Sequence, residues 1–486
     1  MTVETDWGEF DRTLRVRRRQ TFARFVDFLR LDTVSQEPAR VRRGAEWLAR
    51  AMTERGLEAR LLEGEGNPSV YAERRVPGAR RTVLIYCHYD TKPAPPGEWR
   101  QPSPFEPVLR PGLAEDGAPI VDLDAVPDDA LPDHLLYARG ASDDKGPIWA
   151  HLEALALLDA LGLPPRVDVK LIFEGEEEIG SPFFGPLVER HQDLLAADVA
   201  LVTDGPKDAS GRPTIGFGAR GILALELELE VARRDLHSGN FAAPNPAWRL
   251  MGLLASMATP DGEPLIEALE ADVAPPTAAE RELMARIPLD RAGLERDVGV
   301  RLPPDYLERL MFRSTLNIRG LRSGFTGGEG TTIIPHRATV ALDVRLVKNQ
   351  RLEDVYRRIV EHIRGQGFVV IEDPHAPLPD DLRGRAVRVV EKRGYDPAKT
   401  PVDLPISREV VRVVEGAHGG APAVVLPTFG GSVPLWAFTD VLGLPTILVP
   451  YANANNRQHA PNEHLRLDHL FQGIRTTAQL LRDLRD

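Results

Sequence analysis

The chain has little of several features that mark particular classes of protein. Its 486 residues include one cysteine, Cys87, which cannot form an internal disulfide and lies in an apolar run, so we expect a buried, unreactive thiol. No apolar run approaches the roughly 20 residues that a membrane-spanning helix needs. The N-terminal residues also lack the apolar core of a secretory signal. We therefore expect a cytoplasmic protein that does not contact membranes.

Basic residues are fewer than acidic ones. Lysine and arginine number 60 against 72 aspartates and glutamates, which leaves a formal net charge of −12. Because no basic patch with interleaved aromatic residues is present, the sequence argues against a nucleic-acid partner and favours small molecules or peptides. The composition, with 42% hydrophobic and 27% charged residues, is that of a globular protein, and the length predicts two domains.

The first stretch that points to chemistry is VLIYCHYD, from Val83 to Asp90. Its apolar part predicts a strand that is covered on both faces. His88 follows where the strand should end, and Asp90 is placed to hold the second imidazole nitrogen. Taken alone, such a pair is more often an ordinary core or surface pair than part of a metal site, so the rest of the chain must decide.

Other strand patterns end in the same way. Val167 to Phe173 runs into EGEEEIGS, and Asp198 to Val202 runs into Asp204. Since helical patterns alternate with these strands, we expect a mostly parallel sheet whose ligands gather at the carboxyl ends of the strands. The acids and imidazoles found at such ends are His88, Asp90, Asp143, Asp144, Glu176, Glu177, Glu178, Asp204 and His459.

This set of side chains predicts a metal site. So many carboxylates in one place would repel one another and raise their pKa values unless a cation lay among them. Carboxylate and imidazole ligands together suit zinc, with manganese or cobalt as substitutes. The set exceeds one tetrahedral shell, which indicates two divalent ions that share a carboxylate.

A change of periodicity predicts a second domain. Gly221 to Val231 alternates strictly between apolar and polar residues, and Thr339 to Val347 does the same, as half-exposed strands do. Apolar strand patterns return near the C-terminus. We therefore expect an α/β domain with a mostly parallel sheet, formed by residues 1–210 and 397–486, and an inserted α+β domain formed by residues 211–396.

Five motifs in order give the chain a family resemblance: HYD at the end of the first strand, ARGASDDKG, EGEEEIGS, the strand-ending Asp204, and RQHAPNEH. They resemble the metallopeptidase family of carnosine dipeptidases, carboxypeptidase G, acetylornithine deacetylase and succinyl-diaminopimelate desuccinylase. The resemblance covers nearly the whole chain and implies a zinc-peptidase-like fold with a lid and dimerisation domain. Aspartate at position 204, ASDDKGP and LHSG are similar to the dipeptidase branch.

The resemblance also implies roles for residues of the metal site. His88 and Asp204 would hold one ion, Glu178 and His459 the other, and Asp143 would bridge them through a loop with a cis Asp143–Asp144 peptide bond. Glu177, aligned with the family's EGxEExGS pattern, would be the general base and acid. Asp90 would orient His88 without binding metal.

Four further residues match the family's substrate contacts. His237, in RRDLHSGNF, would reach the active site of the partner subunit in a homodimer formed through the inserted domain, and Arg345 would bind the substrate carboxylate. Thr332 and Ser432 match further contacts. Without the resemblance, His237 would be read as a surface histidine and Arg345 as an exposed arginine of a strand.

The sequence therefore predicts a hydrolase that cleaves the peptide bond of dipeptides or short peptides with a metal-activated water. A deacylase of N-acyl amino acids or an N-carbamoyl amidohydrolase of the same family is the first alternative. A non-catalytic binding protein on the same fold is the second. The wording YANANNRQ before His459 departs from that of carnosine dipeptidases and leaves the preferred substrate side chains open.

Overall fold

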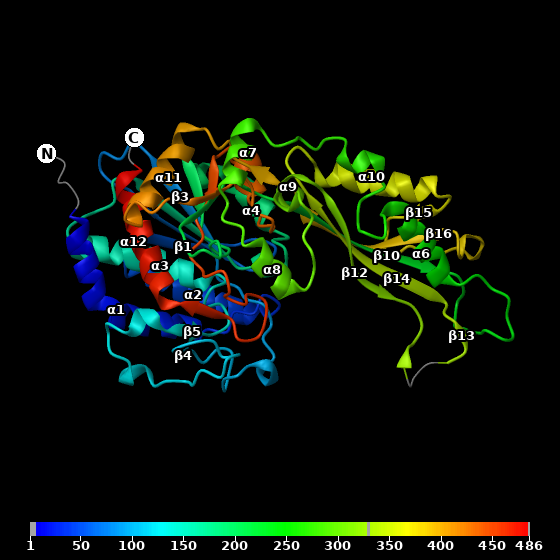
Figure 1. The fold of residues 1–486 in the computed structure, drawn as a ribbon, viewed down its shortest axis with the longest axis horizontal. Helices are drawn as coiled ribbons and strands as arrows, with labels where there is room; N and C mark the ends of the chain where they lie inside the picture. The colour runs from blue at the N-terminus through cyan, green and yellow to red at the C-terminus, as the bar shows by residue number, and fades with distance from the viewer. Residues whose placement is uncertain (1–5, 328–330, 485–486) are drawn as a thin grey trace.

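The molecule is elongated and has two lobes, as Figure 1 shows. The computed structural model describes residues 6–327 and 331–484. The first lobe is built on an eight-stranded sheet and the second on a five-stranded sheet. The first and last helices of the chain, α1 (Trp7–Leu29) and α12 (Leu467–Asp483), both belong to the first lobe (Figure 1). The predicted fold class, an α/β domain with an inserted α+β domain, is confirmed.

The eight-stranded sheet of the first lobe is mixed, with a parallel centre. In spatial order its strands are β1 (Glu58–Leu62), β2 (Ser69–Arg74), β6 (Asp168–Glu174), β3 (Thr82–His88), β7 (Val199–Val202), β19 (Thr446–Leu448), β8 (Thr214–Gly216) and β18 (Val424–Leu426). The four neighbours β6, β3, β7 and β19 run parallel. Their carboxyl ends therefore meet at one edge of the sheet, where α/β proteins bind their ligands.

Helices cover both faces of this sheet. Strand β3 is covered on both sides, since Val83, Ile85 and Cys87 belong to one hydrophobic core while Leu84 and Tyr86 belong to another. The first core includes α1 (Trp7–Leu29), α2 (Pro38–Thr53), α3 (Lys145–Ala160), α11 (Pro405–Ala417) and α12 (Leu467–Asp483). The second includes α4 (Phe184–Arg190), α5 (Gln192–Leu195) and the π-helical turn η8 (Ala437–Val441). A continuous apolar strand fits this double burial.

The five-stranded sheet of the second lobe has one covered face. Its strands, in spatial order, are β12 (Thr315–Arg322), β14 (Arg337–Leu346), β10 (Gly221–Glu230), β16 (Ala386–Tyr395) and β15 (Val369–Ile371). Helices α6 (Pro246–Met257) and α10 (Leu352–Gly365) pack on one face against the alternate leucines of β10. The glutamates between those leucines take the other face, which explains the strict alternation of β10.

Helices also form in the Pro-rich, charged stretch of residues 259–304 and just beyond it. They are α7 (Ala278–Ala285), α8 (Arg291–Val298) and α9 (Tyr306–Phe312), with the short turn η5 (Glu267–Glu270) before them. At the start of α7, Thr277 and Glu280 form a reciprocal capping box. Glu280 forms a buried ion pair with Lys399, and α7 packs on β18. Helix α7 therefore lies against the first lobe, although its residues fall between strands of the second.

The remaining elements are short. The excursion of residues 92–132 contains β4 (Val108–Arg110), η1 (Pro96–Glu98), η2 (Leu123–Ala125) and part of η3 (Leu131–Asp133). Strand β4 pairs with β5 (Leu135–Tyr137), and β5 pairs with β20 (His464–Arg466). Small pairs join β9 (Gly218–Ala219) to β17 (Ala398–Lys399) and β11 (Leu236–His237) to β13 (Ile333–Ile334), and η7 covers Asp380–Leu382. Within the described ranges, no helix is long and apolar enough to cross a membrane.

Candidate metal centre

Three neighbouring parallel strands bring polar side chains to one edge of the central sheet. His88 is the last residue of β3, and Asp204 lies two residues beyond the end of β7. Strand β6 runs into the 3-10 turn η4 (Glu177–Ile179). Because β6, β3 and β7 are adjacent and parallel, these side chains meet although they are far apart in the sequence.

Two groups of potential metal ligands form at this edge. One consists of His88, Asp143 and Asp204, and the other of Asp143, Glu178 and His459, with the ligand atoms of each group within 4.8 Å of one another. His88 Nε2 lies 3.0 Å from Asp143 Oδ1, and His459 Nε2 lies 3.0 Å from Asp143 Oδ2. The two oxygens of Asp143 therefore face different groups. The structure brings together all five residues that the sequence predicts as ligands.

Asp143 does not come from the sheet edge itself. It lies in the loop between β5 and α3, and its peptide bond to Asp144 is cis, as the family resemblance predicts. Helix α3 begins at Lys145, directly after this peptide bond. The backbone N–H of His88 donates to Asp144 Oδ2 at 3.3 Å, which ties this loop to the end of β3.

Asp90 holds the loops around His88 in place. Its carboxylate lies 3.4 Å from Nδ1 of His88, the ring nitrogen that faces away from Asp143. The backbone N–H groups of Glu177 and Glu178 donate to Asp90 at 3.2 and 3.1 Å, and Ser35 Oγ donates at 2.7 Å. Asp90 therefore contacts both the imidazole and the glutamate turn, and it belongs to neither ligand group.

The structure separates the three consecutive glutamates. Glu176 turns away from the centre and accepts a hydrogen bond from the backbone N–H of Asn67 at 2.8 Å. Glu178 joins the ligand group with His459, and their Oε2 and Nε2 atoms lie 3.1 Å apart. The pKa of Glu177 is raised far above its usual range, first by burial, and His88 and Asp204 are among the charged groups that act on it. Glu177 thus lies beside the ligands without belonging to either group.

Burial of so many acids makes the centre electrostatically costly. Burial raises the pKa of Asp204 to about 6, and it raises the pKa of Asp144 well above its usual value. Hydrogen bonds to Asp143 and Glu178 raise the pKa of His459 to about 10. Although burial opposes the charged form of Asp143, hydrogen bonds from His459 and His88 lower the pKa of this carboxyl.

A pair of divalent ions fits these residues. Both carboxylate oxygens of Glu178 are buried. Oε1 accepts no hydrogen bond within the described part of the chain, whereas Oε2 lies 3.1 Å from His459 Nε2 and 3.3 Å from Lys92 Nζ. Buried oxygens without hydrogen bonds are costly unless a cation binds them. Imidazole and carboxylate donors suit zinc, manganese or cobalt, and the shared Asp143 suits two ions.

Arg345 and Ser432 meet where the two lobes touch. Arg345 lies near the end of β14, and its Nη1 donates to Ser432 Oγ at 2.8 Å. Ser432 in turn donates to the carbonyl of Gly221 at 3.3 Å. Asp343 Oδ2 lies 3.6 Å from Arg345 Nε. The structure thus joins two of the predicted substrate contacts.

His237 and Thr332 lie elsewhere, on the second lobe. His237 is exposed on β11, and the carbonyl of Thr332 accepts from the N–H of Ser238 at 3.0 Å. Strand β13, the partner of β11, lies at the end of the second lobe that is remote from β3 (Figure 1). The structure therefore keeps this pair away from the metal centre of its own chain.

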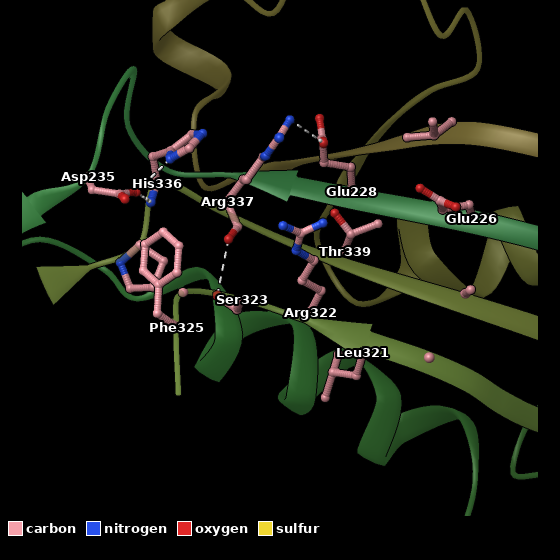
Figure 2. Close-up of a pocket in the computed structure, with 15 residues that line it drawn as sticks. Glu226, Glu228, Asp235, Leu321, Arg322, Ser323, Phe325, His336, Arg337 and Thr339 are labelled. Atoms are coloured by element: carbon pink, nitrogen blue, oxygen red, sulfur yellow. Dashed lines mark hydrogen bonds and ion pairs between the residues drawn. The ribbon is translucent and has the colours of Figure 1, made fainter. Parts of the chain in front are cut away.

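A groove of about 700 Å³ lies on the polar face of the second-lobe sheet, beside the strand pair β11 and β13. Figure 2 shows the residues that line it. Asp235 Oδ1 and His336 Nδ1 lie 2.6 Å apart at one end of it, and Arg337 pairs with Glu228 at 3.3 Å. No residue that lines this groove belongs to a ligand group. The Asp235–His336 contact lies beside the β11–β13 pair that carries His237.

Three residues that touch the centre were not predicted. Ser35 donates to Asp90, Lys92 pairs with Glu178, and Glu463 accepts hydrogen bonds from the loop of Asp143. Glu463 lies within the HAPNEH motif that supplied His459, so its position was a usable signal. Ser35 and Lys92 lie in segments without a motif and could be found only from the fold.

Comparison with known proteins agrees with this geometry. The model of peptidase family M20/M25/M40 matches residues 120–483. The chain is similar to the Cys-Gly metallodipeptidase of Schizosaccharomyces pombe, with 26% identity over 418 residues, which cover 84% of this chain and 80% of that protein. It is also similar to the human Beta-Ala-His dipeptidase, with 24% identity over 85% of this chain and 76% of that protein.

A solved structure shares the fold as well. The metallo-carboxypeptidase Sso-CP2 of Sulfolobus solfataricus superposes with a TM-score of 0.80 and 29% identity. The superposition covers 95% of this chain and 98% of that one. The likeness therefore extends over both lobes.

Proposed function

The chain belongs to peptidase family M20/M25/M40, and from this membership we propose that it is a metal-dependent dipeptidase with two divalent ions. The observation that carries the proposal is the pair of ligand groups that share Asp143, with Glu177 beside them. A single catalytic zinc ion needs only three protein ligands, whereas the two groups together contain five residues.

The proposed ligands divide between the two ions. His88 and Asp204 would hold one, Glu178 and His459 would hold the other, and Asp143 would be common to both. When bound, such ions lower the pKa of a water and polarise the scissile carbonyl. Asp90 fixes the imidazole of His88 and the glutamate turn from behind.

Glu177 is the proposed general base and acid. Its carboxylate takes the proton of the attacking water as the oxygen of that water bonds to the peptide carbon. It then returns the proton to the amine nitrogen when the carbon–nitrogen bond breaks. Burial raises the pKa of Glu177 above its usual range, which suits a group that must hold a proton between these two steps.

Arg345 and Ser432 are proposed to hold the carboxylate at the end of the substrate. The guanidinium presents a planar pair of N–H donors, which matches a carboxylate. Ser432 fixes one of its nitrogens and supplies a hydroxyl beside it. This contact lies at the junction of the lobes, so substrate binding there would also draw the lobes together.

We propose a homodimer that is formed through residues 211–396. His237 lies far from the metal centre of its own chain, so a second copy must receive it if it is to donate to the oxyanion, with Thr332 as a neighbouring contact. The second lobe also exposes large apolar side chains: Trp248 and Met251 on α6, and Ile318 and Leu321 on the edge strand β12. Such exposure is typical of a protein interface.

Zinc is the proposed metal, with manganese or cobalt as substitutes, because the donors are imidazole and carboxylate. The cytoplasmic location expected from the sequence stays a prediction. So do the domain boundaries at residues 210 and 396.

A substrate panel on the zinc-loaded protein tests the proposal. We expect hydrolysis of free dipeptides and little hydrolysis of N-acetyl or N-carbamoyl amino acids. Turnover of those blocked amino acids alone would favour the deacylase or amidohydrolase alternative. Cleavage of N-blocked dipeptides at a similar rate would favour a carboxypeptidase, the activity named for the Sulfolobus structure. Intact ligand groups with no bound metal and no turnover would favour a binding protein.

A further inference from the structure

Glu463 is a fully buried carboxylate that receives five hydrogen bonds from one short loop. Its Oε2 accepts from Arg139 Nη1 at 2.7 Å and from the backbone N–H of Gly140 at 3.1 Å. Its Oε1 accepts from the N–H and the Oγ of Ser142, both at 3.0 Å, and from the N–H of Asp143 at 3.1 Å. The side chain of Glu463 is 0% exposed. Water therefore cannot replace these contacts.

The loop that Glu463 binds is the one that presents the proposed bridging ligand. Residues 138–144 connect β5 to α3 and are all buried, so each of their N–H groups needs an acceptor. Glu463 supplies the acceptor for Gly140, Ser142 and Asp143 together. Since the backbone of Asp143 is held in this way, its two carboxylate oxygens can face His88 and His459.

Glu463 also belongs to the loop that presents His459, four residues earlier. This loop is conformationally demanding, because Arg457, His459 and Asn462 all have left-handed backbone angles, with φ of 58°, 62° and 63°. The excursion of residues 92–132 contacts the outer side of this His459 loop. There Glu115 Oε1 lies 3.1 Å from Arg457 Nη1, and the N–H of Arg100 donates to Asn462 Oδ1 at 2.8 Å.

We propose that Glu463 is a positioning residue that couples the Asp143 loop to the His459 loop, and so sets the geometry in which two ions can share Asp143. The inference rests on the proposed function, because it concerns how this chain holds the ligand common to both ions. Groups that orient metal ligands in this way contribute about 10- to 100-fold to metal affinity. We expect an effect of that size on metal binding, separate from any effect on folding.

The chain offers a matched control. Glu153 is a second buried carboxylate of the first lobe, 7% exposed, and Arg55 Nη2 donates to it at 2.5 Å. Thr21 Oγ1 donates to its other oxygen at 3.1 Å. Glu153 belongs to neither ligand group, so E153Q disturbs a comparable buried ion pair without touching the metal centre. In E463Q, an amide NH2 group replaces one carboxylate oxygen. This group cannot accept a hydrogen bond, yet it faces two or three N–H or O–H donors.

The experiment titrates metal-free wild type, E463Q and E153Q with zinc against a competing chelator, and it records the absorption spectrum of each protein loaded with cobalt. We expect E463Q to bind at least one ion about 10- to 100-fold more weakly, with a changed cobalt spectrum. E153Q should bind both ions as wild type does, even if its unfolding temperature falls. S142A removes one donor to Glu463 and should also weaken metal binding, by a smaller factor. This variant tests the inference if E463Q does not fold.

Equal affinities in wild type, E463Q and S142A would overturn the inference while leaving the proposed function intact. Equal weakening in E463Q and E153Q would overturn it too, because the effect would then come from lost stability. A wild-type protein that binds no ion would contradict the proposed function itself and would remove this inference with it.

Discussion

Arg345 Nη1 and Ser432 Oγ form a 2.8 Å hydrogen bond that joins the second lobe to the first. Arg345 extends from the polar face of the five-stranded sheet, whereas Ser432 lies in the segment between β18 and β19 of the other sheet. This contact between the lobes contains a guanidinium, which is suited to bind a substrate carboxylate.

Replacing Arg345 with lysine tests this role. Lysine keeps the charge but loses the planar pair of donors, so we expect the KM for dipeptides to rise about 10- to 100-fold while kcat changes little. Steady-state kinetics on dipeptides measure both constants. Arg337→Lys, on the same strand and paired with Glu228, is the control and should leave KM unchanged. An equal rise in KM for dipeptide amides, which lack the carboxylate, would contradict the assignment.

Glu177 and His459 should fail in different ways. Glu177→Gln removes the proposed base but no ligand, so we expect kcat to fall about 10²- to 10⁴-fold with two ions still bound. His459→Ala removes a ligand, so one ion should be lost. Metal analysis and kinetics on the same samples separate the two outcomes. Glu176→Gln, in which the altered side chain faces Asn67, is the matched control and should keep its turnover. Equal loss of metal from the Glu177 and His459 variants would show that the roles are assigned wrongly.

Much of the metal centre could be predicted because its residues follow local patterns. His88 and Asp204 come directly after apolar strands, and the ends of adjacent parallel strands must meet. The family motifs supplied the rest of the set, including Asp143, which lies in a loop and has no strand pattern to place it. The alternation of apolar and polar residues in Gly221–Glu230 is also a local pattern, and it predicted the half-exposed strand.

The parts that were not predicted depend on contacts between distant segments. Glu463 binds residues that lie about 320 positions earlier, and no local periodicity reports such a contact. Helices α7 and α8 have eight residues each and few buried side chains, so their apolar pattern is weak. The position of His237 far from the metal centre of its own chain was expected only from the family resemblance, because no local pattern reports the length of the second lobe.

Mixed dimers test whether His237 acts across subunits. Glu177→Gln and His237→Ala chains should each be inactive. If His237 serves the partner's site, co-expression restores one working site in each mixed dimer, or about a quarter of wild-type activity for random pairing. Affinity tags of two kinds isolate the mixed dimers for assay. No recovery in purified mixed dimers, or full activity in a monomeric wild type, would contradict the dimer proposal.

His151 should make the fold sensitive to acid. It is buried between Thr203 and Thr477, which contact its ring nitrogens at 2.9 Å each, and burial lowers its pKa from 6.5 to about 3. Below pH 6.5 the unfolded chain binds a proton at this histidine that the folded chain does not. The neutral His151 therefore does not reduce the free energy of unfolding above pH 6.5. As the pH falls from 6.5 toward 3, the free energy of unfolding decreases, by about 2 kcal/mol at pH 5.

Urea unfolding at pH 7 and pH 5 measures this loss. The variant His151→Gln cannot titrate, so the free energy of its unfolding should fall less between the two pH values than that of wild type. An identical fall in both proteins would show that other groups cause the acid sensitivity.

The most direct test of a dinuclear metallodipeptidase is to remove all metal with a chelator and then restore zinc in measured amounts while following dipeptide hydrolysis. Because Asp143 joins two ligand groups, we predict no hydrolysis by the metal-free protein and full recovery at two bound ions per chain. Undiminished hydrolysis by the metal-free protein, or full activity with a single bound ion, would contradict the account.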